Sequence, residues 1–303
     1  GSQIVGMGSE FYNNFELVKK IFKEADEKLN YPLSKIILEG PDDELQLTQN
    51  TQPAILTVSY SIFKILEEEF NFNFKSTQFF AGHSLGEYSA LVCSGSLDFR
   101  DAVYLLNERG KAMQEAVPVG KGKMIAVLGL KTNEISDLIK GQNYKGICEI
   151  ANDNAEGQVI ISGDVETVSL FQNFLKERKV KSIQLKVSAP FHCSLMKSAS
   201  ENMKEKIIKT NFKKPFKQIV SNVTAKAETD TDIIKKLLIK QIFSTVKWRE
   251  SIIYMSSMEE KDFIEIGPGK VLSGMVKRTI TNSNCFSINS ITDIKSLQNE
   301  FKK

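Results

Sequence analysis

The sequence is poor in the side chains that most often bind metal ions or form disulfide bonds. Its 303 residues include two histidines and four cysteines, and the cysteines stand far apart at Cys93, Cys148, Cys193 and Cys285. No CxxC pair or other metal-ligand spacing is present, so we expect free thiols rather than a zinc site or a disulfide framework. We therefore expect no metal ion and no cofactor.

Long apolar runs and an excess of one charge are also missing. No stretch approaches the roughly 20 apolar residues that a membrane-spanning helix needs. The 40 basic residues are dispersed among 37 acidic ones, and the net charge is +3. This composition predicts a protein that contacts neither a membrane nor nucleic acid. A mildly basic surface suits an acidic protein partner or a phosphate-bearing substrate.

What the sequence does contain is a hydrophobic pattern typical of an α/β protein with an inserted unit. Apolar residues recur at helical spacing over residues 51–70, with Pro53 expected in the first turn. The elements expected after residue 123 run strand, helix, strand, strand, helix, strand, which is the ferredoxin-like order. We predict a ferredoxin-like subdomain over residues 123–187, inserted into a larger α/β domain made of residues 1–122 and 188–303.

A candidate nucleophile lies in the segment Gly82 to Gly86 (GHSLG), which matches the GxSxG nucleophile elbow. A strand is expected directly before this segment and a helix directly after it, as the elbow requires. The two glycines should let the strand and helix approach each other and leave the Ser84 Oγ exposed. The backbone N–H of Leu85, at the start of the helix, can stabilise an oxyanion. The pattern predicts Ser84 as a nucleophile.

A serine nucleophile needs a general base, and only His83 and His192 are available. His83 lies inside the elbow, where its side chain should point away from the nucleophile and pack or hydrogen-bond locally. His192 follows the last predicted strand of the subdomain, on a loop at the expected domain junction. We therefore predict His192 as the base. No acidic third member of a triad can be identified from the sequence.

Five longer segments carry a more specific pattern than the pentapeptide. They are residues 51–54 (TQPA), 81–92 (AGHSLGEYSALV), 109–114 (RGKAMQ), 188–192 (SAPFH) and 265–272 (EIGPGKVL). In these segments the chain resembles the malonyl-CoA:acyl-carrier-protein transacylases of type II fatty acid synthesis. The segments occur in the order of that family, and the likeness covers nearly the whole chain.

The resemblance implies an α/β-hydrolase-like catalytic domain and a two-step acyl transfer. A malonyl group would pass from malonyl-CoA to Ser84 and then to the phosphopantetheine thiol of acyl carrier protein, supplying fatty acid biosynthesis. His192 would be the base. The resemblance also implies that the backbone carbonyl of Gln241 holds the imidazole N–H, in place of the usual triad carboxylate.

Substrate and partner residues also follow from the resemblance. Arg109 matches the arginine that pairs with the free carboxylate of malonate, which a planar guanidinium can hold by two parallel hydrogen bonds. Lys277 and Arg278 are candidates for docking the acidic carrier protein. The family also has a PGQGSQ signature whose first glutamine assists the oxyanion hole. The sequence begins inside that signature, and Gln3 is its later glutamine, so Gln3 is not given this role.

Two other functions are compatible with a GHSxG elbow. One is a serine carboxylesterase or thioesterase of similar fold, although such hydrolases place an acidic residue and then a histidine after the serine, often near the C-terminus. Here no histidine follows His192. The other is a non-catalytic scaffold that binds acyl carrier protein. We expect a monomer in the bacterial cytoplasm, or in the plastid or mitochondrial matrix if a leader has been removed.

Overall fold

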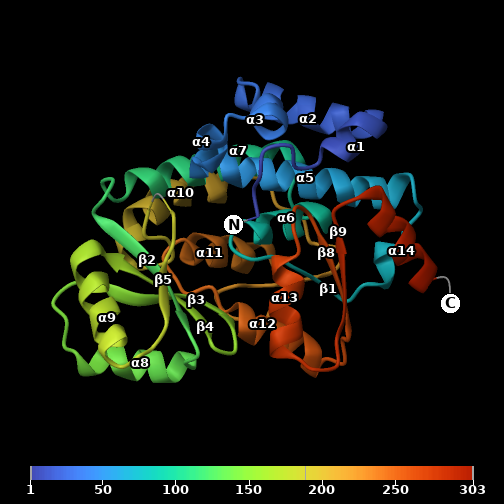
Figure 1. Cartoon of the computed structure of the whole chain (residues 1–303). Helices are drawn as coiled ribbons and strands as arrows, with labels where there is room; N and C mark the ends of the chain where they lie inside the picture. The colour runs from blue at the N-terminus through green and yellow to red at the C-terminus, as the bar shows by residue number, and fades with distance from the viewer. Residues whose placement is uncertain (1, 188, 302–303) are drawn as a thin grey trace.

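The computed structural model describes residues 2–187 and 189–301 of the chain (Figure 1). The expected domain boundary at residue 188 and the end of the chain at residue 303 lie outside the described residues. The N-terminal part is mostly helical. Its elements are α1 (Ser9–Asn14), α2 (Glu16–Leu29), α3 (Leu33–Glu39), α4 (Asp42–Gln46), α5 (Thr48–Glu68), the short 3-10 helix η1 (Phe74–Ser76), β1 (Phe79–Ala81), α6 (Gly86–Cys93) and α7 (Phe99–Glu115).

The long helix α5 begins three residues earlier than the sequence predicted. Pro53 therefore lies inside the helix and not in its first turn, which corrects that expectation. A proline has no N–H to donate to the carbonyl four residues earlier, here that of Gln49. The side chain of Asn107 in α7 donates to this carbonyl at 3.0 Å, so the missing bond is replaced. A Cβ on Gly110 would lie 2.4 Å from the Cα of Gln49, so glycine is needed where α7 packs against α5.

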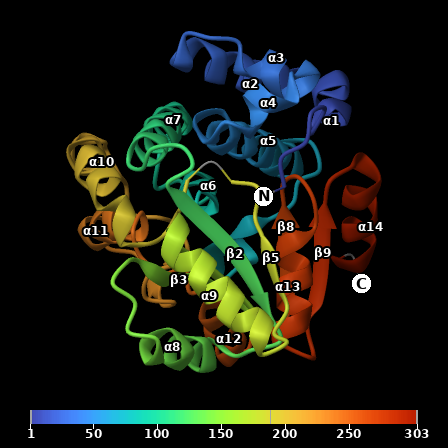
Figure 2. The ribbon, with the colours of Figure 1, turned by 60° about the vertical axis from the view of Figure 1, so that its left-hand side comes forward.

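The predicted βαββαβ segment is present, with bounds that differ by a few residues. Its elements are β2 (Gly122–Leu128), α8 (Thr132–Gly141), β3 (Cys148–Ala155), β4 (Gln158–Asp164), α9 (Val165–Glu177) and β5 (Ser182–Gln184). The strands pair antiparallel in the order β3-β4-β2-β5. Figures 1 and 2 show these elements together on one side of the molecule. The order of elements is confirmed, and the division into two domains stays a prediction.

This four-stranded sheet buries side chains on both faces. Ile125 and Val127 pack with Val168 and Phe171 of α9 in one apolar cluster, whereas Met124 and Ala126 lie in another cluster that Phe191 joins. Alternate residues of β2 therefore contact opposite sides, as the period of a strand requires. Because Phe191 precedes His192, the second face of the sheet supports the loop of the candidate base.

The rest of the chain returns to the larger body of the molecule. Its elements are η2 (Ser194–Met196), α10 (Lys197–Lys209), β6 (Gln218–Val220), β7 (Ala227–Glu228), α11 (Thr231–Gln241), α12 (Trp248–Ser257), β8 (Asp262–Ile266), α13 (Val271–Thr279), β9 (Asn284–Ile288) and α14 (Ile291–Phe301). Strand β1 pairs parallel with β6, which pairs antiparallel with β7, and β8 pairs parallel with β9. The mixture of helices and sheets confirms the predicted α/β class.

Two further findings concern the expectations drawn from composition. The four cysteines are free thiols, as predicted. Among residues 2–187 and 189–301, no helix is long and apolar enough to cross a membrane.

Candidate active site

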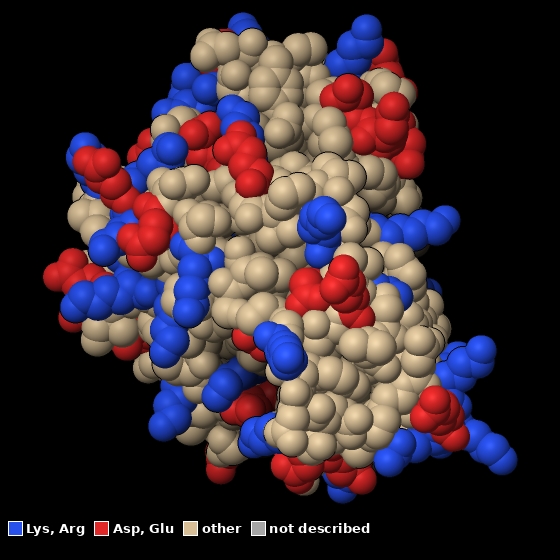
Figure 3. Space-filling view, turned by 90° about the vertical axis from the view of Figure 1, so that its left-hand side faces the viewer, with Lys and Arg blue, Asp and Glu red and all other residues tan. Residues whose placement is uncertain are grey.

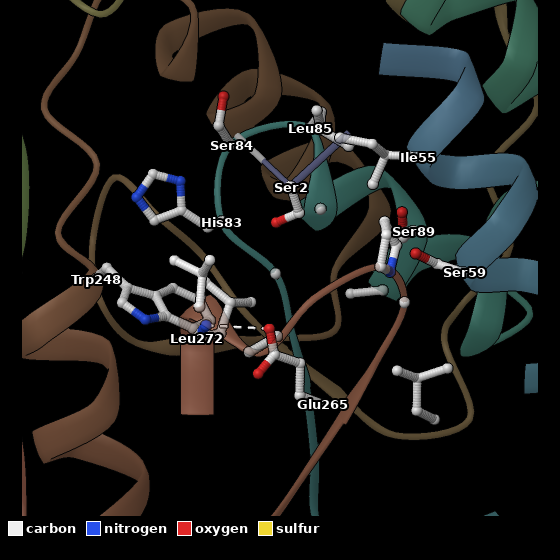
Figure 4. A pocket seen from close by; sticks show the side chains of 18 of the residues that line it. Ser2, Ile55, Ser59, His83, Ser84, Leu85, Ser89, Trp248, Glu265 and Leu272 are labelled. Carbon is white, nitrogen blue, oxygen red and sulfur yellow. Dashed lines mark hydrogen bonds between the residues drawn. The ribbon is translucent and has the colours of Figure 1, made fainter. Parts of the chain in front are cut away.

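A cavity of about 1450 Å³ lies where the elbow, the βαββαβ segment and the C-terminal elements meet. Strands β1 and β8 line it along their whole lengths, and β4 and α13 also contribute residues. Figure 4 shows part of this cavity, with Ser84 and Leu85 in its wall and Trp248, Leu272 and Glu265 also lining it. Every predicted site residue on the elbow therefore faces one common space.

The elbow has the strained geometry that its sequence motif predicts. Ser84 has a φ of 53°, in the left-handed region that non-glycine residues rarely occupy. A Cβ on Gly82 would lie 1.9 Å from the carbonyl oxygen of Gly86, so only glycine allows this close approach. A Cβ on Gly86 would meet nothing within 4 Å. The expectation that both glycines are needed for packing is thus wrong for Gly86, whose missing side chain leaves open space at the cavity.

Asn222, two residues after the end of β6, ties the two sides of this turn together. Its Oδ1 accepts a hydrogen bond from the Ser84 amide at 2.6 Å, and its Nδ2 donates to the Gly82 carbonyl at 2.8 Å. Asn222 is fully buried. Nothing in its sequence surroundings marked it, since β6 is only three residues long and carries no recognised motif.

Ser84 and His192 are in direct contact, although 108 residues separate them in the chain. The Ser84 Oγ lies 2.7 Å from His192 Nε2, and His192 Nδ1 lies 2.9 Å from the backbone carbonyl of Gln241. A carbonyl oxygen only accepts, so the imidazole proton is on Nδ1 and the Nε2 lone pair faces the serine hydroxyl. The hydroxyl therefore donates to Nε2. The structure brings together the three residues predicted for this relay.

The loop that carries His192 also has strained backbone, with a φ of 58° at His192 itself. A carboxylate from β3 holds the residues that follow. Glu149 accepts from the Ser194 amide at 2.8 Å and from the Ser194 hydroxyl at 2.6 Å. Sequence reasoning did not find Glu149, because an acidic residue on a half-buried strand carries no motif. The βαββαβ segment thus helps to place the candidate base.

His192 is 5% exposed, and burial together with the nearby Arg109 guanidinium lowers its pKa to about 3. The imidazole is therefore neutral at physiological pH and able to accept a proton. His83 behaves differently. Its Nε2 donates to Asn154 Oδ1 at 2.8 Å, and its ring packs edge-on against Trp248. The prediction that His83 is not paired with the serine is consistent with this contact, but its hydrogen bond reaches β3 and is not local.

The backbone N–H of Leu85 is the predicted oxyanion donor. Leu85 directly precedes α6 and lines the cavity beside Ser84. No hydrogen-bond acceptor for this amide is found among residues 2–187 and 189–301. A free N–H at the positive end of a helix is suited to bind an oxyanion that forms at the serine.

Arg109 is 1% exposed and reaches the same centre from α7. Its guanidinium donates to Gln52 Oε1 at 2.6 Å, to Gln241 Oε1 at 2.9 Å and to Ser84 Oγ at 3.1 Å. Its buried Nε has no hydrogen-bond partner in the described part of the chain. A buried guanidinium with neutral partners and a spare donor can bind an entering carboxylate. Gln52 was noticed in the sequence only as part of the TQPA segment, without a role.

The two predicted docking residues are not among the residues that line the cavity. Lys277 and Arg278 are exposed on the last turn of α13, whose Val276 lines the cavity. Arg278 donates to Gln158 Oε1 at 2.9 Å and so connects α13 with β4. For metal ions, the described residues contain no cluster of three or more His, Cys, Asp or Glu side chains placed to bind one.

A family model and individual related proteins both match this chain over most of its length. The family model described as the acyl transferase domain matches residues 1–302. The chain is 44% identical over 280 residues to the malonyl CoA-acyl carrier protein transacylase of Bacillus subtilis, covering 92% of this chain and 87% of that protein. It is 39% identical over 290 residues to the protein of the same name from Escherichia coli K12, covering 95% and 93%.

Solved structures agree with these sequence matches. The acyl-carrier-protein S-malonyltransferase of Bartonella henselae superposes with a TM-score of 0.96 at 36% identity, covering 100% of this chain and 97% of that one. A malonyl-transacylase solved in complex with its type II PKS acyl-carrier protein superposes with a TM-score of 0.94 at 36% identity, covering 99% and 96%.

Proposed function

The chain belongs to the acyl transferase domain family, and on that premise we propose that it moves a malonyl group from malonyl-CoA to acyl carrier protein. The acceptor is the phosphopantetheine thiol of the carrier, and the product supplies fatty acid synthesis. The observation that carries this proposal is the relay from Ser84 Oγ through the imidazole of His192 to the carbonyl of Gln241. The activity is that named for its relatives.

In the first half-reaction, Ser84 Oγ attacks the thioester carbonyl while His192 Nε2 takes the hydroxyl proton. The carbonyl oxygen becomes an oxyanion, which the Leu85 amide stabilises. The tetrahedral intermediate then expels the thiolate of coenzyme A, and the imidazolium returns the proton to it. The products are malonyl-serine and free thiol. The Gln241 carbonyl stabilises the imidazolium by accepting from Nδ1 throughout.

The second half-reaction runs the same steps in reverse with a different thiol. His192 takes the proton of the carrier's phosphopantetheine thiol, and the thiolate attacks the malonyl-serine ester. Collapse of the intermediate releases Ser84, which recovers its proton from the imidazolium. The cycle is ping-pong and uses no metal or redox cofactor. Water is the competing nucleophile, so an esterase would differ in this step alone.

Arg109 gives the site its preference for an acyl group with a free carboxylate. The acyl chain on Ser84 places its distal carboxylate near the guanidinium that already contacts Ser84 Oγ. A charged hydrogen bond formed away from water is strong, whereas an acetyl group brings no carboxylate into contact with the buried Arg109. The proposal therefore includes selectivity for malonyl over acetyl groups.

Acyl carrier protein docks near Lys277 and Arg278, which directly follow the cavity-lining Val276 in the chain. On the face shown in Figure 3, Lys and Arg are interspersed with Asp and Glu, so that view shows no single-sign surface. The adjacent basic residues Lys277 and Arg278 in the last turn of α13 form a local pair that can steer an acidic carrier. Reversing both charges to Glu should raise the apparent KM for the carrier more at low salt than at high salt. Equal kinetics across a salt series would remove these residues from the docking site.

We also propose an oligomeric state and a cellular location. The protein acts as a monomer, without nucleic acid or a membrane. It works in the bacterial cytoplasm, or in a plastid or mitochondrial matrix if the protein is nuclear-encoded.

The test is a two-step transfer assay with purified protein. Malonyl-CoA is added first, and the remaining malonyl-CoA and free coenzyme A are then removed. Phosphopantetheinylated acyl carrier protein is added second. We expect release of free coenzyme A in the first step and malonyl-carrier in the second. Release of free malonate instead of malonyl-carrier would identify a thioesterase, and no covalent adduct would identify a non-catalytic scaffold. Arg109→Ala should lower malonyl loading and spare acetyl loading, whereas an equal fall in both would give Arg109 a structural role only.

A further inference from the structure

The side chain of Gln241 connects several parts of the site, in addition to its backbone carbonyl. Gln241 is fully buried at the end of α11. Its Oε1 accepts from the Arg109 guanidinium at 2.9 Å, while its Nε2 donates to the Ser84 carbonyl at 3.0 Å and to Glu87 Oε2 at 2.8 Å. The amide therefore has an acceptor directed at Arg109 and a donor directed at the elbow helix α6.

Only one of the two orientations of this amide suits Arg109. If the amide turned over, its NH₂ group would face the guanidinium, and two donors would be in contact. Its oxygen would at the same time face the Ser84 carbonyl and the Glu87 carboxyl oxygen. Leaving buried polar groups unpaired in this way costs more free energy than an ordinary hydrogen bond contributes. The acceptors on the elbow side and the Arg109 donor thus favour the same orientation of the amide.

Glu87 supplies one of these acceptors from inside the protein. It is the second residue of α6 and is 2% exposed. The same oxygen, Oε2, also accepts from the Asn222 amide at 3.1 Å. Burial of a carboxyl group is costly, and here it raises the pKa of Glu87 to about 7. Because both bonds reach one oxygen, a proton on the other oxygen leaves them intact.

We propose that Glu87 is a positioning residue that fixes the orientation of the Gln241 amide and, through it, the Arg109 guanidinium. Glu87 thereby sets the preference of the site for acyl groups with a free carboxylate. It touches neither the acyl group nor the imidazole, because His192 is held by the backbone carbonyl of Gln241. This inference rests on the proposed malonyl transfer and adds a determinant of its selectivity.

The test compares loading of Ser84 from malonyl-CoA and from acetyl-CoA in three variants. Glu87→Met keeps the side-chain length but removes the acceptor, whereas Glu87→Gln keeps one acceptor oxygen for both bonds. Tyr88→Phe is the matched control, since the buried Tyr88 hydroxyl has no hydrogen-bond partner among the described residues. Intact-protein mass spectrometry gives the loading rate for each acyl group.

We expect Glu87→Met to lower the malonyl-to-acetyl rate ratio by about 10-fold or more, from the cost of an unpaired buried donor. Glu87→Gln should restore the ratio to near the wild-type value at pH 6 and at pH 8, and Tyr88→Phe should leave it unchanged. A wild-type ratio in Glu87→Met, or equal losses for both acyl groups, would overturn the inference. A low ratio in Glu87→Gln would also overturn it, because the charge and not the acceptor would then matter.

A second variant keeps the inference testable if Glu87→Met does not fold. Gln241→Met retains the backbone carbonyl that holds His192 but removes the amide through which Glu87 acts. It should lower the same ratio, and combining it with Glu87→Met should add little further loss. An unchanged malonyl-to-acetyl ratio in Gln241→Met would show that the Gln241 amide does not affect selectivity, and it would overturn the inference. If the wild-type protein takes up no malonyl group, the proposed function fails, and this outcome is separate from any change in the ratio.

Discussion

The nucleophile elbow and the loop of the base both hold a strained residue, but different contacts hold each in place. Ser84 and His192 have φ angles of 53° and 58°. At the elbow, the turn is closed by bonds between near neighbours, such as the Gly86 amide to the His83 carbonyl at 2.9 Å. The His192 loop instead depends on Gln241 and Glu149, which lie on α11 and β3. At the elbow, these local bonds act together with the distant side chains of Asn222 and Gln241, which bond the Ser84 backbone. At the base, the orienting contacts come from distant parts of the fold.

The largest effect on activity is expected when the side chain of the base is removed. His192→Ala should lower the rate of Ser84 acylation by about 10³-fold near neutral pH, because an unassisted serine hydroxyl is a weak nucleophile. The rate can be followed from the malonyl adduct in single-turnover experiments. Acylation near the wild-type rate would mean that another group, such as His83, serves as the base.

Alanine at the two elbow glycines tests which of them the close approach of strand and helix requires. Gly82→Ala should lower the free energy of unfolding by about 3 kcal/mol or more, since its Cβ would collide with the Gly86 backbone. Gly86→Ala should change it by less than about 1 kcal/mol, because its Cβ meets open space. Chemical denaturation of both variants gives the comparison. Equal effects would show that the two glycines have the same role in packing.

The base loop should respond to a change in a different part of the fold. Glu149→Ala removes both acceptors that hold Ser194, so His192 loses part of its support. We expect acylation to fall by about 10-fold. Glu177→Ala, an exposed residue at the end of α9, is the matched control and should have no effect. Unchanged acylation in Glu149→Ala would mean that the Gln241 carbonyl alone positions the imidazole.

The smallest effect is expected from pH. Because the pKa of His192 is lowered to about 3, the imidazole remains a base when the pH falls from 8 to 5. The acylation rate at saturating malonyl-CoA should therefore stay nearly constant over this range, as measured by rapid quenching. A fall by half near pH 6.5, the ordinary value for histidine, would contradict the burial of this ring.

The shifted pKa values of His192 and Glu87 change the stability of the folded protein in opposite directions as the pH falls. Between pH 3 and 6.5 the unfolded His192 binds a proton that the folded one does not, so this group makes the protein less stable as the pH falls. Glu87, with its pKa raised to about 7, binds a proton in the folded state between pH 4.5 and 7, so it adds stability as the pH falls. The two effects partly cancel, which makes the acylation rate the clearer measure.

The sequence predicted the parts of the site that are contiguous in the chain. The elbow, its serine and the following helix were found because five adjacent residues carry the geometry. The βαββαβ order was found because hydrophobic periods change within short segments. The roles of Gln241 and Arg109 came only from the family resemblance, since neither lies in a pattern that indicates its partners. The structure brings both side chains to Ser84.

Other residues could not be predicted because their importance arises from contacts over long sequence distances. Asn222 contacts the Ser84 amide from 138 residues away, and Glu149 contacts Ser194 from 45 residues away. Glu87 is adjacent to the elbow, but an acidic residue in the first turn of a helix is ordinarily explained by the helix dipole. Its burial, which the sequence does not reveal, makes it unusual.

Mapping of the acyl group after brief exposure to malonyl-CoA tests the central claim most directly. The wild-type protein should gain the mass of one malonyl group, and proteolysis with mass spectrometry should place it on Ser84. The Ser84→Ala protein should remain folded and gain no mass, because the hydroxyl is the only part of the side chain that reacts. A malonyl group on another residue, or on the Ser84→Ala protein, would contradict the account.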